Sequence, residues 1–401
     1  MKRLFRNIHL YLALAAGLVI MNSCITGAIM VFEDDIDLAV HKERYFVDPR
    51  GQRLPLQAIA EAAAKVVPKG KFAALKLYLD PKRSAEVSFV LPEKPTRELG
   101  IASTMVQSPK GKNEIGDRKK GGKPGLFVYV NPYTGSVLDV YNKRQSFFFT
   151  VERLHRWLLG GPASVGKIIV GLSTLSFLII TVTGIVLWWP KNKKILLQRL
   201  KFKTSGRLKR LNHDLHVVSG FYTSIFLLII IVTGLIMSYT WASKSIFTLT
   251  KTSPESPEPP ASVYRPGIKT IDYNVAIAAL SSKLAQAEYF MLRAPKDSTG
   301  IFAVNVLPVQ VIEIAVDTYY VDQYSGQLIG QQLFKDKNKG QMIRSYVKPI
   351  HTGAIYGMPT KLFNFILALL TCSFPVTGVI MWLNRIRKKK KKTVVLSALI
   401  K

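Results

Sequence analysis

The stretch RLNHDLHVVSGFYTSIFLLIIIVTGLIMSYTW, residues 210–241, decides how the rest of the chain is interpreted. It opens with His213 and His216 and continues through 25 mostly apolar residues. About 20 such residues in an α-helix cross the hydrocarbon layer of a bilayer. An imidazole at the end of such a segment costs free energy unless it has a hydrogen-bond partner or a ligand. It therefore indicates a functional site or a fixed structural contact.

Three further segments have the same apolar character. The 401 residues are 48% hydrophobic and 20% charged, which is too apolar for an ordinary soluble protein and too charged for an entirely membrane-embedded one. We therefore predict an α-helical membrane protein with two outer domains between its spans. The predicted transmembrane helices are 1–32, 161–190, 214–241 and 356–384, the outer domains are 33–160 and 242–355, and the basic loop and tail are 191–213 and 385–401.

The net charge of +31 is concentrated at one side of these predicted spans. Residues 1–7, 190–212 and 384–401 hold three, nine and eight Lys or Arg and no Asp or Glu. These are the segments that share one side if the chain crosses four times, so the positive-inside rule predicts cytoplasmic termini and outer domains across the membrane. A basic run beside a membrane helix contacts anionic lipid more often than RNA, so we expect a lipid bilayer and no nucleic acid as partner.

The chain contains an internal repeat. Each span has a Gly after a Thr, and His9 precedes Gly27 by 18 residues, as His216 precedes Gly234. The corresponding offsets between the two halves stay between 191 and 207 residues, which predicts a duplicated unit of helix, outer domain and helix. MNSC (21–24) offers the alternative of a cleaved lipoprotein signal. The repeat argues against cleavage, because the third span cannot be a signal peptide.

Each outer domain has an α+β pattern. Residues 56–67 have a helical pattern, and alternating strand-like segments follow from 72 to 142. Residues 274–286 and four segments between 288 and 334 repeat that order, whereas the Lys-, Gly- and Pro-rich stretch 94–124 is expected to be a flexible insertion. Neither domain has a nucleophile–base arrangement, a zinc-ligand spacing or a phosphate-binding loop.

Helical periodicity separates the histidines of the opening stretch. Eighteen residues are five helical turns, so His216 faces the same way as Gly234, and Gly220 lies one turn further on that face. His213 has Val217 there, so we expect His216 to be the ligand candidate and His213 a neighbour. Another histidine, His41, lies in charged sequence and is expected to be an ordinary surface residue.

The predicted depth of four histidines in the membrane assigns them to two pairs. His9 and His216 lie near the predicted inner face, and His155 and His351 near the outer face, each opposite Thr-Gly motifs of the other helices. This arrangement fits two stacked haems, each held by two imidazoles, and such haems transfer electrons because both axial positions are filled. No C-x-x-C-H occurs, so the haems would be bound non-covalently. The alternative is that the four are interfacial histidines hydrogen-bonded to backbone.

The segments LNHDLHVVSGFY (211–222), LHRWLLGG (154–161) and HTGAIYGMPTK (351–361) resemble the PepSY-associated transmembrane family of bacterial inner-membrane proteins. The resemblance covers nearly the whole chain and implies four spans, two periplasmic PepSY-type domains and haem b. It also implies that His9, His155, His216 and His351 are the haem ligands, and that the protein takes part in the reduction of ferric siderophores during iron uptake. The chain has Tyr11 where the family often has a larger aromatic residue.

Two functions from different classes follow. The first is a di-haem electron carrier of the ferric-siderophore-reductase type, which receives electrons from an external reductase or quinol. Since the chain has no G-x-G-x-x-G after a strand, it contains no recognisable NAD or flavin site to serve as its own donor. The second is a non-redox membrane sensor or peptidase regulator whose outer domains bind peptide.

Overall fold

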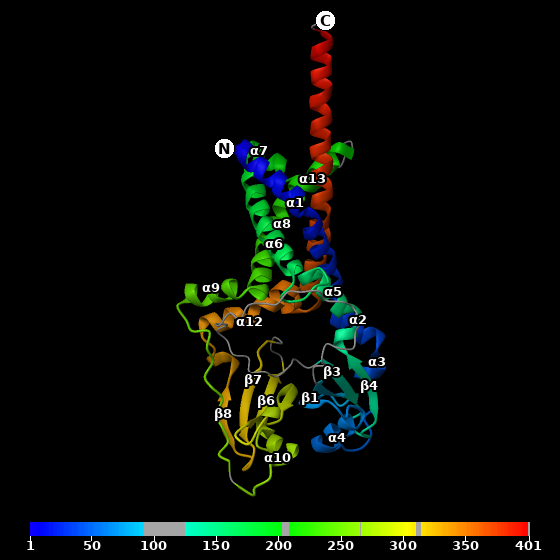
Figure 1. Cartoon of the computed structure of the whole chain (residues 1–401), viewed down its shortest axis with the longest axis vertical. Helices are drawn as coiled ribbons and strands as arrows, with labels where there is room; N and C mark the ends of the chain where they lie inside the picture. Colours follow the sequence, from blue (N-terminus) through cyan, green and yellow to red (C-terminus); the bar gives the residue numbers. More distant parts are fainter. Residues whose placement is uncertain (92–124, 203–207, 265, 310–313, 400–401) are drawn as a thin grey trace, which may run out of the picture. The chain divides into compact units, whose positions relative to one another are not determined.

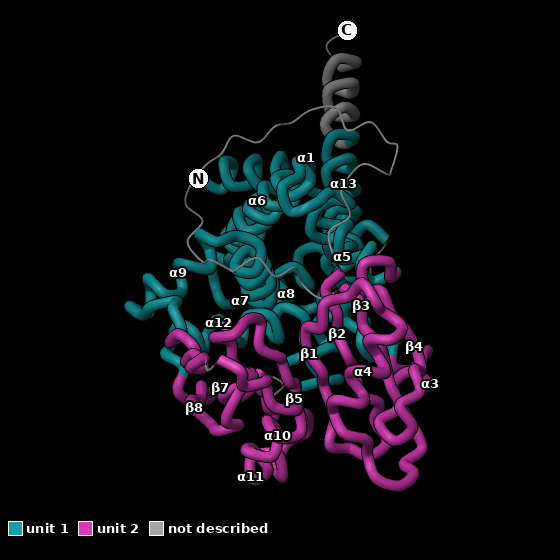
Figure 2. Tube along the Cα trace, turned by 60° about the horizontal axis from the view of Figure 1, so that its bottom comes forward, with its two compact units in different colours: residues 1–37, 147–256, 337–401 teal, residues 38–146, 257–336 magenta. Residues whose placement is uncertain are grey.

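The computed structural model describes residues 1–91, 125–202, 208–264, 266–309 and 314–399, with side chains up to residue 387. The chain forms two compact units, coloured separately in Figure 2. The helical unit contains Met1–Asp37, Phe147–Ser256 and Lys337–Lys401, and the sheet unit contains Leu38–Ser146 and Pro257–Asp336. The predicted insertion at 94–124 lies outside the described residues.

Four long apolar helices of the helical unit are long enough to cross a membrane, as predicted. They are α1 (Lys2–Val31), α6 (Val165–Trp188), α8 (Leu208–Ser238) and the membrane portion of α13 (Met358–Leu399). Figure 1 shows them grouped as a bundle, in which α1 packs against α6 and α13, and α8 packs against both of these. The basic tail begins inside α13, because Lys and Arg are good helix formers and nothing in 385–399 ends the helix.

Shorter helices complete this unit, and several of them lie where the sequence predicted outer-domain residues. α5 (Phe147–Trp157) packs on α1 and α6, and α12 (Lys339–Thr352) packs on α8 and α9. Both are amphipathic, so each buries one face against the bundle instead of joining the sheet. The other helices are α7 (Lys193–Arg199), α9 (Thr240–Thr250) and the 3₁₀ turn η3 (Ala354–Tyr356), while α2 (Glu33–Val40) contains the boundary between the two units.

The described residues of the sheet unit form one antiparallel sheet of eight strands in the order β4-β3-β2-β1-β5-β6-β7-β8. Each predicted outer region contributes four strands, and β1 joins β5 through the register Leu75–Leu292 to Tyr78–Tyr289. The alternating segments of the sequence thus form strands as predicted. Their bounds are β1 Lys71–Tyr78, β2 Ala85–Val90, β3 Leu126–Val130, β4 Val137–Asn142, β5 Ala287–Arg293, β6 Ile301–Pro308, β7 Asp317–Asp322 and β8 Leu328–Gln332.

Helices from both regions cover one shared core on this sheet. α4 (Leu56–Val66) buries Ile59 and Ala63, and the short helices α10 (Tyr273–Ala278) and α11 (Ser281–Leu284) continue the same cluster beside β5 and β6. A fully buried aliphatic side chain contributes about 1.5–3 kcal/mol, so this continuous core holds the two regions together. The remaining short elements are α3 (Lys42–Tyr45), η1 (Lys143–Gln145) and η2 (Phe334–Asp336).

Equivalent turns close the two outer hairpins. Gly135, between β3 and β4, and Gly326, between β7 and β8, both have a φ of 73°, where a side chain would be strained. The side chains of Asn131 and Asp322 accept backbone N–H groups at the start of these turns. The two halves therefore share element order and turn geometry, while the internal duplication itself stays a prediction.

Candidate functional site

The four histidines singled out by the sequence lie on four different helices of the helical unit and meet in two pairs. His9 on α1 and His216 on α8 have ring centroids 6.4 Å apart. His155 on α5 and His351 on α12 have ring centroids 6.5 Å apart. An imidazole nitrogen binds a first-row metal ion at about 2 Å, so two imidazoles on opposite sides of one ion place their centroids about 6 Å apart. Both pairs have this spacing.

The inner pair, His9 and His216, is fixed by the Thr-Gly motifs of α6 and α13. His9 Nδ1 lies 3.0 Å from the Ile180 carbonyl oxygen and 3.1 Å from Thr183 Oγ1. His216 Nδ1 lies 2.9 Å from Thr377 Oγ1 and also donates to the Phe374 carbonyl. Each ring is therefore held by the threonine that precedes a glycine, together with a carbonyl from the preceding turn.

The outer pair, His155 and His351, repeats this arrangement with α1 and α8. His155 Nδ1 lies 2.9 Å from the Ser23 carbonyl oxygen and 3.0 Å from Thr26 Oγ1. His351 Nδ1 lies 3.1 Å from the carbonyl oxygen of Ile230 and 3.0 Å from Thr233 Oγ1. His9 and Thr26 are separated by 17 residues of α1, so the two pairs lie about 25 Å apart along that helix.

These contacts fix the tautomer of all four imidazoles. A carbonyl oxygen can only accept a hydrogen bond, so the Nδ1 atom that faces it carries the proton. The Nε2 atom of each neutral ring then carries a lone pair, which is the state that binds a metal. Metal-ligating histidines commonly donate their second ring N–H to a backbone carbonyl in this way.

Burial keeps the outer pair in that neutral form. Desolvation, with the neighbouring His351 as a smaller contribution, lowers the pKa of His155 to about 4. Burial also lowers the pKa of His351, and the hydrogen bond to Ile230 opposes that shift without cancelling it. Both pKa values are lowered, so both side chains are neutral and available as ligands near pH 7.

The glycines of the Thr-Gly motifs lie next to the four histidines. Each glycine faces the edge of an imidazole. A Cβ added to one of these glycines would lie very close to the Cε1 atom of one histidine. The distance would be 3.4 Å from Gly27 to His155, 3.3 Å from Gly184 to His9, 3.1 Å from Gly234 to His351 and 3.2 Å from Gly378 to His216. A side chain would therefore displace the ring, and glycine lets each imidazole approach the backbone of the neighbouring helix.

Open space beside the inner pair occurs instead at Gly220, one turn from His216. A Cβ built there meets no atom within 4 Å. Ala13, one turn from His9, is the corresponding small residue on α1. Small residues at both positions would leave room for a broad, flat group beside this pair.

Comparison with known protein families matches residues 6–385 to the PepSY-associated TM region. The chain belongs to this family. The match includes all four spanning helices and both histidine pairs, so the resemblance inferred from the sequence is confirmed. A comparison with curated protein sequences found none that matches the chain.

Two other histidines of this PepSY-associated chain lie outside the pairs. The side chain of His213 is 46% exposed, and its Nδ1 is 3.1 Å from Oδ1 of the buried Asp214. Arg210 Nε binds the other carboxylate oxygen at 2.9 Å. His213 thus belongs to a charged cluster at the start of α8, while His41 lies at the start of α3 in the sheet unit.

Protein side chains alone do not complete a metal site in the part of the chain that the structure describes. No group of three or more His, Cys, Asp or Glu side chains there could hold an ion. Each histidine pair supplies two nitrogen ligands, so a six-coordinate metal would need four more donor atoms from another source. A porphyrin has four such nitrogens, and the donor set therefore fits haem.

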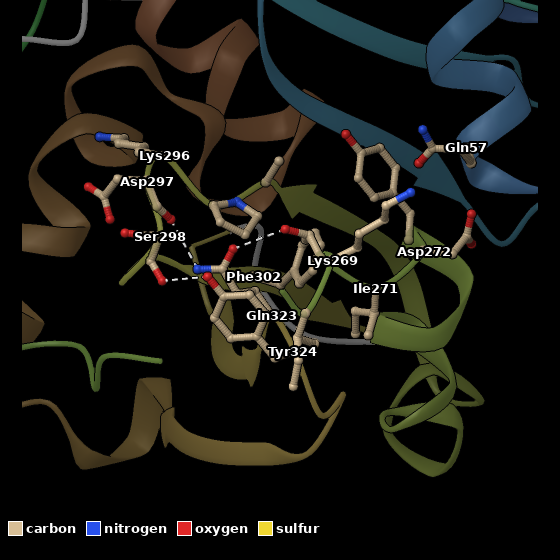
Figure 3. Close-up of a pocket in the computed structure, with 15 residues that line it drawn as sticks. Gln57, Lys269, Ile271, Asp272, Lys296, Asp297, Ser298, Phe302, Gln323 and Tyr324 are labelled. Atoms are coloured by element: carbon tan, nitrogen blue, oxygen red, sulfur yellow. Dashed lines mark hydrogen bonds between the residues drawn. The ribbon is translucent and has the colours of Figure 1, made fainter. Parts of the chain in front are cut away.

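The sheet unit of this family member carries a second candidate site. A cavity of about 810 Å³, within the size range of small-molecule sites, is lined by the segments 268–273 and 294–298 and by Tyr324 (Figure 3). Gln323 also lines the cavity, and its side-chain amide donates hydrogen bonds to the carbonyl oxygens of Asp297 at 3.0 Å and Gly300 at 2.7 Å. The lining includes two lysines, Lys269 and Lys296, and two aspartates, Asp272 and Asp297. Their charges balance, so the charge of the lining favours neither a cationic nor an anionic ligand.

Sequence reasoning missed the hydroxyls that hold the histidines. The signal was present, because a threonine precedes the glycine in all four spans. Each hydroxyl also donates to its own helix backbone, as Thr183 Oγ1 does to the Ile179 carbonyl at 2.8 Å, so its oxygen remains the acceptor for Nδ1.

Proposed function

We propose that this member of the PepSY-associated family is a b-type di-haem electron-transfer protein of the bacterial inner membrane. Its proposed activity is reduction of a ferric siderophore, or another ferric chelate, during iron uptake. The observation that carries the proposal is the pair of bis-imidazole arrangements, each with the centroid spacing and the Nδ1 hydrogen bonds expected of metal ligands. A bound haem would supply one-electron chemistry at its iron.

The chain's own residues would determine what that iron can do. His9 and His216 would hold one haem, and His155 and His351 would hold the other, so the two haems would supply electron transfer and not oxygen binding. Threonine and carbonyl partners hold each imidazole in one orientation and increase its basicity through the Nδ1 hydrogen bond. Fixed ligand geometry suits electron transfer, which requires little movement between the two oxidation states.

The proposed path runs from an inner donor to an outer acceptor. The pairs occupy opposite ends of α1, with His9 near its start and the His155 partner Thr26 near its end. An external reductase or a membrane quinol would supply the electrons. Reduction of the ferric acceptor would favour release of the metal, because ferrous ion is a poorer match than ferric ion for hard oxygen donors.

Reporter fusions test the proposed orientation, with cytoplasmic termini and a periplasmic sheet unit. The basic residues at 1–7, 190–212 and 384–401 predict that a fusion after Leu200 is cytoplasmic and one after Pro260 is periplasmic. We expect fluorescence of a green fluorescent protein fusion only after Leu200, and alkaline phosphatase activity only after Pro260. The reverse pattern would show that the sheet unit faces the cytoplasm.

The visible spectrum of the purified chain separates the proposal from its runner-up. A Soret band with the sharp visible bands of a six-coordinate haem is expected, with two haems per chain by pyridine haemochrome assay. The runner-up is a non-redox membrane sensor or peptidase regulator, which the cavity of the sheet unit favours because it could hold a peptide side chain. A colourless preparation, even after expression with added haem, would support that second function.

The threonine partners give a graded test. Thr377→Val removes the hydroxyl 2.9 Å from His216 Nδ1 but keeps the side-chain shape, and Thr377→Ser keeps the hydroxyl. Removal of such an outer hydrogen bond reduces metal-site affinity by about 10- to 100-fold. We expect the Val variant to lose haem to an excess of apomyoglobin faster than wild type, and the Ser variant to behave like wild type. Equal retention in both would show that the hydroxyl does not support the ligand.

A further inference from the structure

The only two cysteines of the chain, Cys24 and Cys372, face each other across two spanning helices. Cys24 is on α1 and Cys372 is on α13, and the two thiols are close enough to interact. The Cys372 thiol in turn lies 3.9 Å from the carbonyl oxygen of Met21, one helical turn before Cys24. Neither cysteine is buried completely, and both are free thiols.

Several contacts of α1 and α13 hold the thiols in this position. Toward the inner end, a Cβ on Gly17 would lie 3.4 Å from Pro375 Cβ, so glycine permits close approach of the two helices. Toward the outer end, the rings of Phe32 and Phe365 lie 5.4 Å apart. As the residue number rises along α1 it falls along α13, so the two helices are antiparallel here. The thiol contact is thus part of a continuous packed interface between α1 and α13.

We propose that Cys24 and Cys372 form a reversible, redox-active dithiol–disulfide pair within the membrane bundle. On oxidation, each thiol loses one hydrogen, an S–S bond forms, and two electrons and two protons pass to an oxidant. A quinone dissolved in the bilayer is the oxidant by chemical class, since it takes up two electrons and two protons to become a quinol. The reverse reaction opens the disulfide at the expense of quinol.

The position of the two cysteines links their redox state to the outer histidines. Cys24 lies between two residues that contact His155. The carbonyl of Ser23, directly before Cys24, accepts a hydrogen bond from His155 Nδ1, and the hydroxyl of Thr26, two residues after Cys24, contacts the same nitrogen. A disulfide would anchor this turn of α1 to α13. The redox state of the thiols would therefore change how firmly the backbone that orients His155 is held.

Thiol counting tests the proposal without requiring bound haem. The reduced full-length chain, in lipid vesicles and freed of reductant, is incubated with decylubiquinone, quenched in acid, and labelled with a maleimide that adds a fixed mass per thiol. Mass spectrometry is expected to show two labels before quinone and none after it, with one quinol formed per chain. The Cys24→Ser and Cys372→Ser variants should each keep their single label.

A displaced-thiol variant is the matched control. Cys372→Ser combined with Ser373→Cys moves the sulfur by about 100° around α13, so this variant should keep both labels after quinone. Two labels retained by the wild-type chain would overturn the proposal, as would disulfide-linked dimers on non-reducing gels. Loss of both labels in the displaced variant would also overturn it, because oxidation would then not depend on the observed contact.

Discussion

Replacement of His216 by alanine is expected to remove about one of two haems per chain, whereas replacement of His213 should remove none. The two residues are one helical turn apart, but only His216 has its ring in the inner pair, 6.4 Å from that of His9. Without its imidazole, the iron of that pair would become five-coordinate or the porphyrin would be lost. His213 instead binds Asp214 and is half exposed.

The pair of variants is well matched for this comparison. Both substitutions delete one imidazole from the same stretch of α8, and Arg210 still pairs with Asp214 when His213 is absent. The measurement is the haem-to-protein ratio of each purified chain, with circular dichroism to confirm equal helix content. Equal loss from both substitutions, or loss from His213→Ala alone, would contradict the assignment of ligands.

Gly234→Leu is expected to abolish the outer haem although glycine contributes no ligand. Even a Cβ at this position would lie 3.1 Å from His351 Cε1, so a leucine side chain would force the imidazole away from its partner. Gly234→Ala should weaken the outer haem less, because only one atom must be accommodated. We expect the absorbance component of the His155–His351 pair to disappear in the Leu variant, with the inner component unchanged.

Val232→Leu is the control for this prediction. Val232 lies two residues away on α8 and is 43% exposed within the helical unit, so a leucine side chain at this position leaves the imidazole in place. A Gly234→Leu chain that retains both components would show that the close contact between glycine and ring is unimportant. By the same argument, Gly184→Leu and Gly378→Leu should affect the inner component.

Much of the architecture was predictable because the bilayer imposes simple rules. Apolar length gave the four spans, and alternation of apolar and polar residues gave the strands of the sheet unit. The 18-residue spacing of His9 from Gly27 is a whole number of turns, and with the depth of each residue it predicted which histidines meet. Periodicity and depth are properties of single helices, so they can be obtained without a structure.

The remaining features depend on contacts between helices, which a single sequence does not specify. The Thr-Gly motifs were visible, but only packing shows that Thr183 binds His9 and that Gly184 contacts its ring edge. The pairing of β1 with β5 likewise merges the strands of two regions into one sheet. The assignment of α5 to the bundle follows from packing of its amphipathic face, which local pattern alone could not distinguish from packing on the sheet.

The most direct test of the central claim is the set of difference spectra of four single variants, His9→Ala, His216→Ala, His155→Ala and His351→Ala. The wild-type chain should hold two haems with separable spectral or redox components. The account predicts that the first two variants lose one and the same component, and that the last two lose the other. A His155→Ala or His351→Ala chain that retains both haems would contradict it, and those residues would then have a structural or acceptor-facing role.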